Sequence, residues 1–317
     1  MMTQKIFPDW QDKTSALFSK HAINEQHSLH EHELFSNEAL ARLIEKTPRS
    51  NYHVNTHDLS YIDKSTWRDG EFGNLSGEEV LKAVEDGHIW INLQRPWEVD
   101  PAYGEVLGQM FDEIESNVPG FKTMKDKNMM TILISSPKIK IFYHCDIPGQ
   151  ALWQIRGRKR LHIYPNSAPF LKDSEMEEII LGRKDEHDIT YEDWYDEHAT
   201  VIDLEPGAMW HWPINGPHRI ENLGVMNVSL TTEHWTKELR NHYAVRYANG
   251  LIRNTFGIQN LDKPNAGLGL YWRLALAGFH KASGIRKLTK MKYNVDFRVD
   301  PKEELGYKDI DAYLLGK

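Results

Sequence analysis

A histidine and an aspartate two residues apart, His144 and Asp146, end a strand-like run that covers residues 138–146. Residues two apart in a strand point to the same face, so an imidazole nitrogen and a carboxylate oxygen can converge on one metal ion. A third ligand from a distant strand would complete a face of two histidines and one carboxylate and leave the opposite positions open. His218 is the candidate, because it opens a new strand-like run after the turns of segment 207–217.

Two further motifs follow the H-x-D pair in order. Residues 154–159 read Q-I-R-G-R-K, and a later segment has the spacing G-x5-P-x4-H at Gly207, Pro213 and His218. With the H-x-D pair they resemble the core of the JmjC and cupin-like Fe(II)/2-oxoglutarate oxygenases over residues 131–235, about a third of the chain. The resemblance implies a mainly β core with flanking helices, folded as a double-stranded β-helix, which is a jelly-roll, cupin/JmjC-like barrel.

The resemblance also implies cofactors and their ligands. It implies that Fe(II) is bound by the catalytic residues His144, Asp146 and His218, with O2 and 2-oxoglutarate as co-substrates. Lys159 stands at the family's position for the cation that pairs with the far carboxylate of 2-oxoglutarate. Its strand phase distinguishes it from Arg158 and Arg160, which point the other way. The alternative is that His144 and His218 are ordinary core histidines of a metal-free barrel and that Lys159 is an exposed lysine.

The sequence departs from the family's pattern at two positions near the ligands. Ile141 stands three residues before the metal histidine, where relatives often carry a Thr or Ser that bonds the far carboxylate. Gln150 stands four residues after the metal aspartate, where many relatives carry Asn, and its longer amide is a candidate cofactor contact. Asn92 and Thr131 are the candidates to replace the missing hydroxyl donor.

Three other residues near these motifs have a different interpretation. His211 precedes Pro213 where the family has a strand residue, so it is interpreted as a structural histidine outside the ligand set. His162 is interpreted as a core or surface histidine. Cys145 lies inside the H-x-D motif and should point away from the metal, as a small packed hydrophobic residue.

Composition limits the class of protein. Of 317 residues, 40% are hydrophobic and 26% charged, which is ordinary for a soluble protein. The net charge of −8 argues against general nucleic-acid affinity, which needs a basic surface. A single cysteine excludes an internal disulfide and fits a reducing compartment. The chain shows no signal-peptide pattern and no apolar run long enough to span a bilayer, so we expect a cytoplasmic protein without a membrane span.

The chain organisation follows from helix and strand signals. We expect residues 1–120 to form a helical N-terminal flank packed on the barrel rather than an independent domain, and residues 121–235 to form the catalytic core. Patterns typical of helix starts in the flank occur at Ser36, at the capping box Ser76 to Glu79, and at Asp100-Pro101.

Two segments lie outside this scheme of flank and strands. The insert 167–200 interrupts the core. Residues 166–200 include eleven acidic and three basic side chains. It is either a solvated surface insert or a lid that contacts substrate, since long insertions in compact domains are often functional. Residues 236–317 should form a helical C-terminal extension. They carry more apolar residues than one face of the barrel needs, which favours a homodimer. A basic amphipathic helix in this extension could alternatively bind an anionic membrane surface or an acidic partner.

Three function classes are compatible with these residues. The leading hypothesis is a 2-oxoglutarate-dependent dioxygenase, a hydroxylase or demethylase, that couples 2-oxoglutarate decarboxylation to oxidation of a protein side chain or small molecule. The second is a metal-binding cupin enzyme that does not use 2-oxoglutarate, in which Lys159 would be dispensable. The third is a non-catalytic regulatory or binding protein of the same fold. The sequence does not identify the prime substrate.

Overall fold

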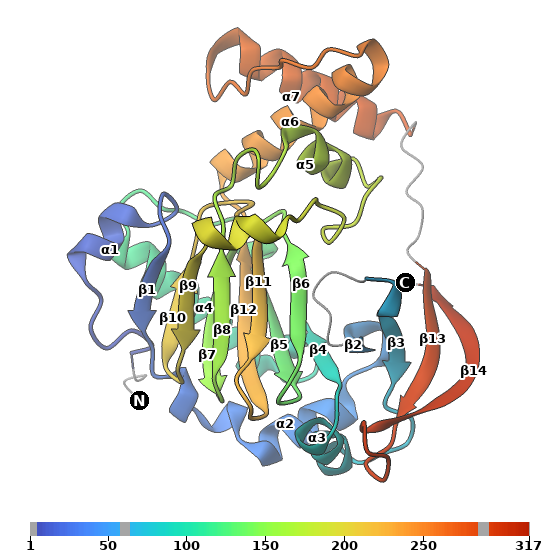
Figure 1. Ribbon diagram of the computed structural model, residues 1–317. Helices are drawn as coiled ribbons and strands as arrows, with labels where there is room; N and C mark the ends of the chain where they lie inside the picture. Colours follow the sequence, from blue (N-terminus) through green and yellow to red (C-terminus); the bar gives the residue numbers. More distant parts are fainter. Residues whose placement is uncertain (1–4, 58–63, 285–291, 317) are drawn as a thin grey trace.

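The structure, a computed structural model, describes residues 5–57, 64–284 and 292–316 (Figure 1). Two sheets form its centre. The smaller sheet has the strand order β6 (Lys140–His144), β11 (His218–Asn222), β8 (Lys159–Ile163) and β9 (Thr200–Leu204). Facing it, the central part of the larger sheet has the order β10 (Ala208–His211), β7 (Gly149–Arg156), β12 (Asn227–His234) and β5 (Met129–Ser135).

Apolar side chains from both sheets fill the space between them. They include Ile141, Leu161 and Ile220 from the smaller sheet and Leu133 and Leu152 from the larger one. From β5 to β12 the chain passes repeatedly between the two sheets, which is the connectivity of a double-stranded β-helix. The predicted mainly β, jelly-roll core is therefore confirmed.

Helices cover the other face of the larger sheet (Figure 1). They are α2 (Asn37–Lys46), α3 (Gly77–Asp86) and α4 (Pro101–Asn117), and a short helix α1 (Asp12–Leu17) precedes them. All three predicted caps form: the side chains of Ser36, Ser76 and Asp100 each accept a backbone N–H of the first turn. The inward stripe of α4 is buried as its periodicity predicts, with Leu107, Met110, Phe111 and Ile114 at its centre.

The larger sheet extends beyond the jelly roll at both edges. β1 (Ile23–Gln26) pairs with β10 at one edge. At the other edge the order continues as β4 (Trp90–Gln94), β2 (Tyr52–Thr56), β3 (Arg68–Glu71), β13 (Lys292–Val299) and β14 (Tyr307–Gly316). The N-terminal flank, which was expected to be helical, therefore also contributes strands to the sheet.

The C-terminal segment differs from the helical extension expected over residues 236–317. Its first part is helical, in α6 (Lys237–Phe256) and α7 (Gly267–Ala282). Its last part is a hairpin instead, in which β13 pairs in parallel with β3 and antiparallel with β14. The buried alternation Val295, Phe297 and Val299 is a period of two, which indicates a strand. Residues 285–288, which we expected at the end of the second helix, lie outside the described residues.

The acidic insert packs on the end of the jelly roll below α6 and α7 (Figure 1). It forms α5 (Asp173–Ile180) and the 3-10 helix η7 (Asp193–His198). Its apolar side chains share a buried cluster with α6, and Asp196 pairs with Arg219 of β11 at 2.6 Å. The insert is thus a packed cap over one end of the sheets. Among the described residues, no helix is both long and apolar enough to cross a membrane.

Candidate metal centre

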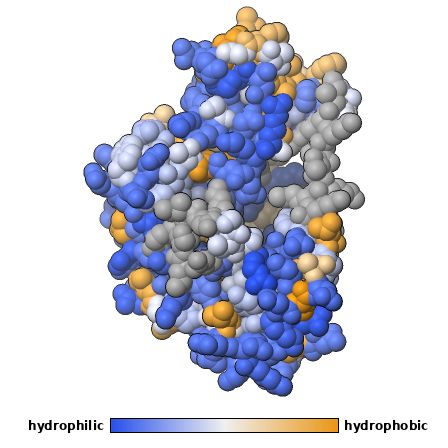
Figure 2. Space-filling view, turned by 45° about the vertical axis from the view of Figure 1, so that its right-hand side comes forward, coloured by the Kyte–Doolittle hydropathy of each residue, from blue (hydrophilic) through white to orange (hydrophobic). Residues whose placement is uncertain are grey.

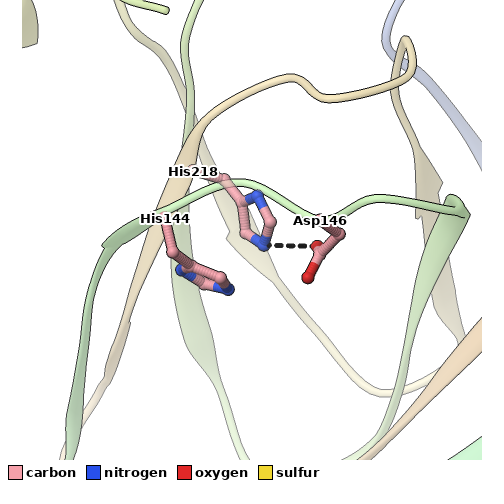
Figure 3. A group of neighbouring side chains, drawn as sticks. All are labelled: His144, Asp146 and His218. Atoms are coloured by element: carbon pink, nitrogen blue, oxygen red, sulfur yellow. Dashed lines mark ion pairs between the residues drawn. The ribbon is translucent and has the colours of Figure 1, made fainter. Parts of the chain in front are cut away.

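The H-x-D pair and His218 meet at one end of the jelly roll. His144 ends β6, His218 begins β11, and the two are antiparallel partners in the smaller sheet. Asp146 follows two residues after β6. One ligand atom from each residue lies within 4.8 Å of the other two, and Figure 3 shows the three side chains grouped together. Within the described parts of the chain, this is the one such group of three or more His, Cys, Asp or Glu residues.

Backbone carbonyls determine which nitrogen of each histidine is available. Nδ1 of His144 lies 2.8 Å from the oxygen of Phe142, and Nδ1 of His218 lies 3.1 Å from the oxygen of Gly216. Because a carbonyl oxygen only accepts, each Nδ1 carries the proton and donates it. Each Nε2 therefore keeps its lone pair, which is the usual arrangement of metal-ligating histidines.

Asp146 is a largely buried carboxylate, 14% exposed, and one of its oxygens is buried and unsatisfied. Its Oδ2 accepts no hydrogen bond from the described residues and lies 3.4 Å from Nε2 of His218. Burial, and then the carboxylates of Glu186 and Glu233, raise the pKa of Asp146 well above its ordinary value. Burial lowers the pKa of His144 far below its ordinary value and that of His218 to about 4, so both imidazoles are neutral at pH 7. This donor set suits a divalent cation.

Lys159 is the second unusual group in this interior. Its side chain crosses from β8 to β12, where Nζ donates to Oγ of Ser229 at 2.7 Å. The residue is 3% exposed, and no carboxylate of the described residues pairs with it. Burial lowers the pKa of the ammonium to about 7. A buried cation without an anion is costly, so this position favours an anionic ligand.

The turn before Lys159 explains why the Q-I-R-G-R-K motif has a glycine at position 157. Gly157 has a φ of +75°, and a Cβ at this position would lie 2.5 Å from the carbonyl oxygen of Met226. The turn fixes the phase of β8. Lys159 then faces the interior, while Arg158 and Arg160 form ion pairs with carboxylates on the outside. The predicted difference in direction between the lysine and the two arginines is confirmed.

The other predicted cofactor contacts lie elsewhere in the interior. The side chain of Gln150, on β7, hydrogen-bonds to Asp146 rather than to Lys159. Asn92 lies opposite Leu133, and Thr131 lies opposite Gln94, in the β4–β5 pair. Neither of these candidates bonds to Lys159 in the described structure. The hydroxyl that does so is that of Ser229, while Ile141 belongs to the apolar interior.

Three side chains near the triad were missed by sequence reasoning. His187 of the insert stacks on His144, with ring centres 4.8 Å apart and an interplanar angle of 18°. Glu186 accepts the backbone N–H of Ile147, and burial, Glu233 and Asp185 together raise its pKa to about 7. Burial also raises the pKa of Glu233 on β12. The alternation of β12 was the available signal for Glu233, which lies two residues after Thr231 on the same face.

The other residues close to the motifs lie away from the triad, as predicted. His211 is buried on the helical side, where it stacks on Phe18 and its Nδ1 donates to the carbonyl of Gln150 at 2.6 Å. Nε2 of His162 lies 3.4 Å from Glu221. Cys145 is fully buried with its sulfur 3.7 Å from that of Met176.

Comparisons with known proteins identify the fold. No family model and no curated protein matches the sequence. An X-ray structure of E. coli YcfD aligns with a TM-score of 0.50 and 13% identity, over 88% of this chain and 69% of that one. A structure described as YcfD, a ribosomal oxygenase from Escherichia coli, in complex with cobalt and 2-oxoglutarate aligns with a TM-score of 0.48 and 12% identity, over 87% and 67% of the chains. The first alignment shows a shared fold.

Proposed function

We propose that this chain is an Fe(II)- and 2-oxoglutarate-dependent oxygenase. The observation that carries the proposal is that one interior holds two sites that lack a charged partner. One is the triad of two neutral histidines and a buried carboxylate, and the other is Lys159, which has no carboxylate partner among the described residues. A divalent cation and a dicarboxylate co-substrate together would balance both sites.

The triad fits iron in its ligand types. Two imidazole nitrogens and a carboxylate oxygen form the facial set that suits Fe(II) and leaves positions for co-substrate and O2. The carbonyls of Phe142 and Gly216 would hold the two rings in the ligating orientation, and Gln150 would hold Asp146. The metal residues of this proposal are therefore His144, Asp146 and His218.

Lys159 and Ser229 would bind the far carboxylate of 2-oxoglutarate. An ammonium and a hydroxyl that already lie 2.7 Å apart offer two donors to one carboxylate. The surrounding interior is apolar, with Leu133, Leu161 and Ile220 among its side chains. Exclusion of water there strengthens the attraction between the ammonium and the carboxylate.

Bound iron and 2-oxoglutarate would supply the oxidising chemistry: decarboxylation to succinate coupled to oxidation of a C–H bond of the prime substrate. The residues of this chain bind, orient and shield these groups. The prime substrate is a protein side chain or a small molecule. If the oxidised carbon is an N-methyl carbon, the hydroxylated product loses formaldehyde and the reaction is a demethylation; otherwise it is a hydroxylation.

The test combines turnover with binding. With Fe(II), O2 and millimolar 2-oxoglutarate, the purified protein should form succinate slowly without a prime substrate. The double variant His144→Ala/His218→Ala and the variant Asp146→Ala should lose most Mn(II) binding, whereas Asp203→Asn, which changes a surface carboxylate, should retain it. If succinate is absent and 2-oxoglutarate does not bind the Mn(II) form, the metal-binding cupin enzyme replaces this proposal.

We further propose a homodimer formed partly by α7. Exposed apolar side chains gather at the top of the molecule (Figure 2), and those of α7 include Leu268, Tyr271, Trp272 and Phe279. A second copy would remove this apolar surface from water. Light scattering at micromolar concentration should give twice the chain mass, and a monomer mass would contradict the proposal.

A further inference from the structure

Asp146 is the one residue of the triad that lies outside a strand. β6 ends at His144, and the ladder between β6 and β11 ends with the pair of His144 and His218. Figure 3 shows Asp146 on the irregular backbone that follows. Backbone groups outside a ladder need other partners, and a ligand on such backbone is placed only as well as those partners hold it. The partners of residues 145–147 therefore determine where the carboxylate lies.

The acidic insert supplies two of these partners from a single residue, Glu186. The backbone N–H of Cys145 donates to the carbonyl oxygen of Glu186 at 3.4 Å, and the backbone N–H of Ile147 donates to its carboxylate. A carboxylate that accepts a backbone N–H forms a stronger hydrogen bond than a neutral acceptor does. One residue of the insert therefore bonds to the chain immediately before and immediately after Asp146.

The insert holds Glu186 in a turn of its own. The backbone N–H of Asp188 donates to the carbonyl of Asp185 at 2.9 Å, and that of Asp185 donates to the carboxylate of Asp188 at 2.8 Å. The carboxylate of Asp185 also accepts the backbone N–H and Nδ1 of His187, at 3.0 and 2.7 Å. These bonds fix the ring of His187 where it stacks on His144. The turn therefore meets the metal ligands with its own hydrogen bonds already made.

A second partner is Asn215, in the loop before His218. Its Nδ2 donates to the carbonyl oxygen of Asp146 at 2.7 Å, and the residue is 5% exposed. Its backbone has a φ of +57°, a conformation that asparagine adopts more readily than most residues do. The next residue, Gly216, provides the carbonyl to which Nδ1 of His218 donates. The loop that orients His218 therefore also holds Asp146.

We propose that Glu186 and Asn215 are positioning residues for the metal, which fix the backbone around Asp146 so that its carboxylate lies beside His218 before the ion binds. The inference rests on the proposed function, because it assigns roles toward the metal of that site. Neither residue is a ligand, and each acts through the chain next to Asp146. The insert, which the sequence leaves as either a solvated surface or a lid, would then support a metal ligand.

The experiment measures the Mn(II) affinity of the full chain, without 2-oxoglutarate, from the EPR signal of the unbound ion. Glu186→Ala and Asn215→Gly should each weaken Mn(II) binding about tenfold or more, as is typical when a residue that holds a metal ligand is removed. Glycine suits position 215 because it tolerates the positive φ. Glu186→Gln keeps an acceptor for the N–H of Ile147 and should restore most of the affinity lost in Glu186→Ala.

Two control variants change the same segments without a bond to Asp146. Glu197→Ala removes an exposed carboxylate of η7 in the insert. Asn166→Ala removes a side chain that donates to the carbonyl of Ile214 at 3.0 Å, in the loop that carries Asn215. Both controls should bind Mn(II) as the wild type does. Thermal melting of the metal-free proteins confirms that each variant is folded.

Hydrogen exchange of the metal-free protein gives a readout that does not depend on the ion. The peptide that covers residues 145–147 should exchange faster in Glu186→Ala and in Asn215→Gly, because its backbone loses a partner in each. It should exchange at the wild-type rate in both control variants. A purely electrostatic effect of Glu186 on the ion would change the Mn(II) affinity and leave this exchange unchanged.

The outcomes separate this inference from the proposed function. Wild-type Mn(II) affinity in folded Glu186→Ala and Asn215→Gly proteins overturns the inference, and so does a loss of affinity with unchanged exchange of residues 145–147. If Glu186→Gln binds Mn(II) as weakly as Glu186→Ala, the role of Glu186 is overturned. In each case the oxygenase proposal stands if the wild type binds Mn(II) and 2-oxoglutarate. If the variants behave as expected but the wild type does not bind 2-oxoglutarate, the positioning role stands and the oxygenase proposal fails.

Discussion

Two buried cations on neighbouring strands of the smaller sheet are balanced in different ways. Arg219, on β11, donates to Asp196 of the insert at 2.6 Å and to the hydroxyl of Tyr164 at 2.9 Å. Burial alone would lower the pKa of Arg219, but Asp196 and Tyr164 raise it above its ordinary value. Lys159, on β8, donates to the hydroxyl of Ser229, and burial lowers its pKa to about 7.

We propose that the difference separates a structural cation, Arg219, from a ligand-binding one, Lys159. The counter-charge of Arg219 comes from the chain itself, so its ion pair holds η7 against β11. On the proposed function, the counter-charge of Lys159 comes from bound 2-oxoglutarate, since the described residues supply none. A buried charge that the fold leaves unbalanced marks a functional position more clearly than burial alone does.

The largest expected effect concerns co-substrate affinity. Lys159→Met should weaken 2-oxoglutarate binding to the Mn(II) form by several hundredfold or more, because the loss of one partner of a buried ion pair costs on the order of 3–5 kcal/mol. Calorimetry measures it, and Mn(II) affinity measured alone should stay near that of the wild type. Arg160→Met, one residue away on the outer face, should leave both affinities unchanged. If Lys159→Met bound 2-oxoglutarate as tightly as the wild type does, Lys159 would not be the ligand-binding cation of this comparison.

The next effect concerns the free energy of unfolding, where we expect the loss at Arg219 and not at Lys159. Arg219→Met should lower the free energy of unfolding by about 2–3 kcal/mol, less than for a fully buried pair because Asp196 is 38% exposed. Lys159→Met should leave the ligand-free protein unchanged or stabilise it by up to about 1 kcal/mol, because it removes an unpaired buried charge. Urea unfolding of the metal-free variants measures both. Equal destabilisation by the two substitutions would make Lys159 structural.

The pH dependence of 2-oxoglutarate binding gives a smaller effect. Since burial lowers the pKa of Lys159 to about 7, the ammonium is present below pH 7 and is lost in the free protein as the pH rises. Above pH 7 binding also has to take up a proton, so affinity should fall by up to about tenfold per pH unit. Titrations of the Mn(II) form at three pH values between pH 6.5 and 8.5 test this. A Lys159→Arg protein should show no such slope, because its guanidinium stays charged.

The smallest effect concerns the hydroxyl beside the ammonium. Ser229→Ala removes the donor that lies 2.7 Å from Nζ of Lys159 and should weaken 2-oxoglutarate binding by about 1 kcal/mol, roughly fivefold. Thr131→Ala is the matched control, because its hydroxyl lies on the same face of the sheet without a bond to Lys159. A larger loss for Thr131→Ala than for Ser229→Ala would transfer the hydroxyl role to Thr131, one of the two candidates from the sequence.

The sequence predicts the parts of the fold that depend on local patterns. The caps at Ser36, Ser76 and Asp100 are set by side chains within a few residues, and each forms as expected. The C-terminal hairpin was missed because the preceding helical pattern was extended through it. Its alternation Val295, Phe297 and Val299 gains meaning only beside β3, more than two hundred residues earlier in the chain.

The candidate site also has residues that the sequence predicts and residues that it does not. His144, Asp146 and His218 belong to spaced motifs at the ends of β6 and β11, and the structure brings them together as expected from the sequence. The surroundings of the triad depend on tertiary packing: His187 reaches His144 because the insert folds back over the end of the sheets. Ser229 shares its face of β12 with two other polar residues, Asn227 and Thr231, and the sequence alone does not say which of them meets Lys159.

The central claim is that Lys159 is the counter-charge for the far carboxylate of a 2-oxo diacid bound beside the triad. The measurement that tests it most directly is calorimetry of the Mn(II) form with 2-oxoglutarate and with 2-oxopentanoate, which has the same chain length but no far carboxylate. The wild type should prefer 2-oxoglutarate by a hundredfold or more, and Lys159→Met should bind the two with similar affinity, in line with a lost buried ion pair of about 3 kcal/mol. Equal binding of the two acids by the wild type would contradict the claim.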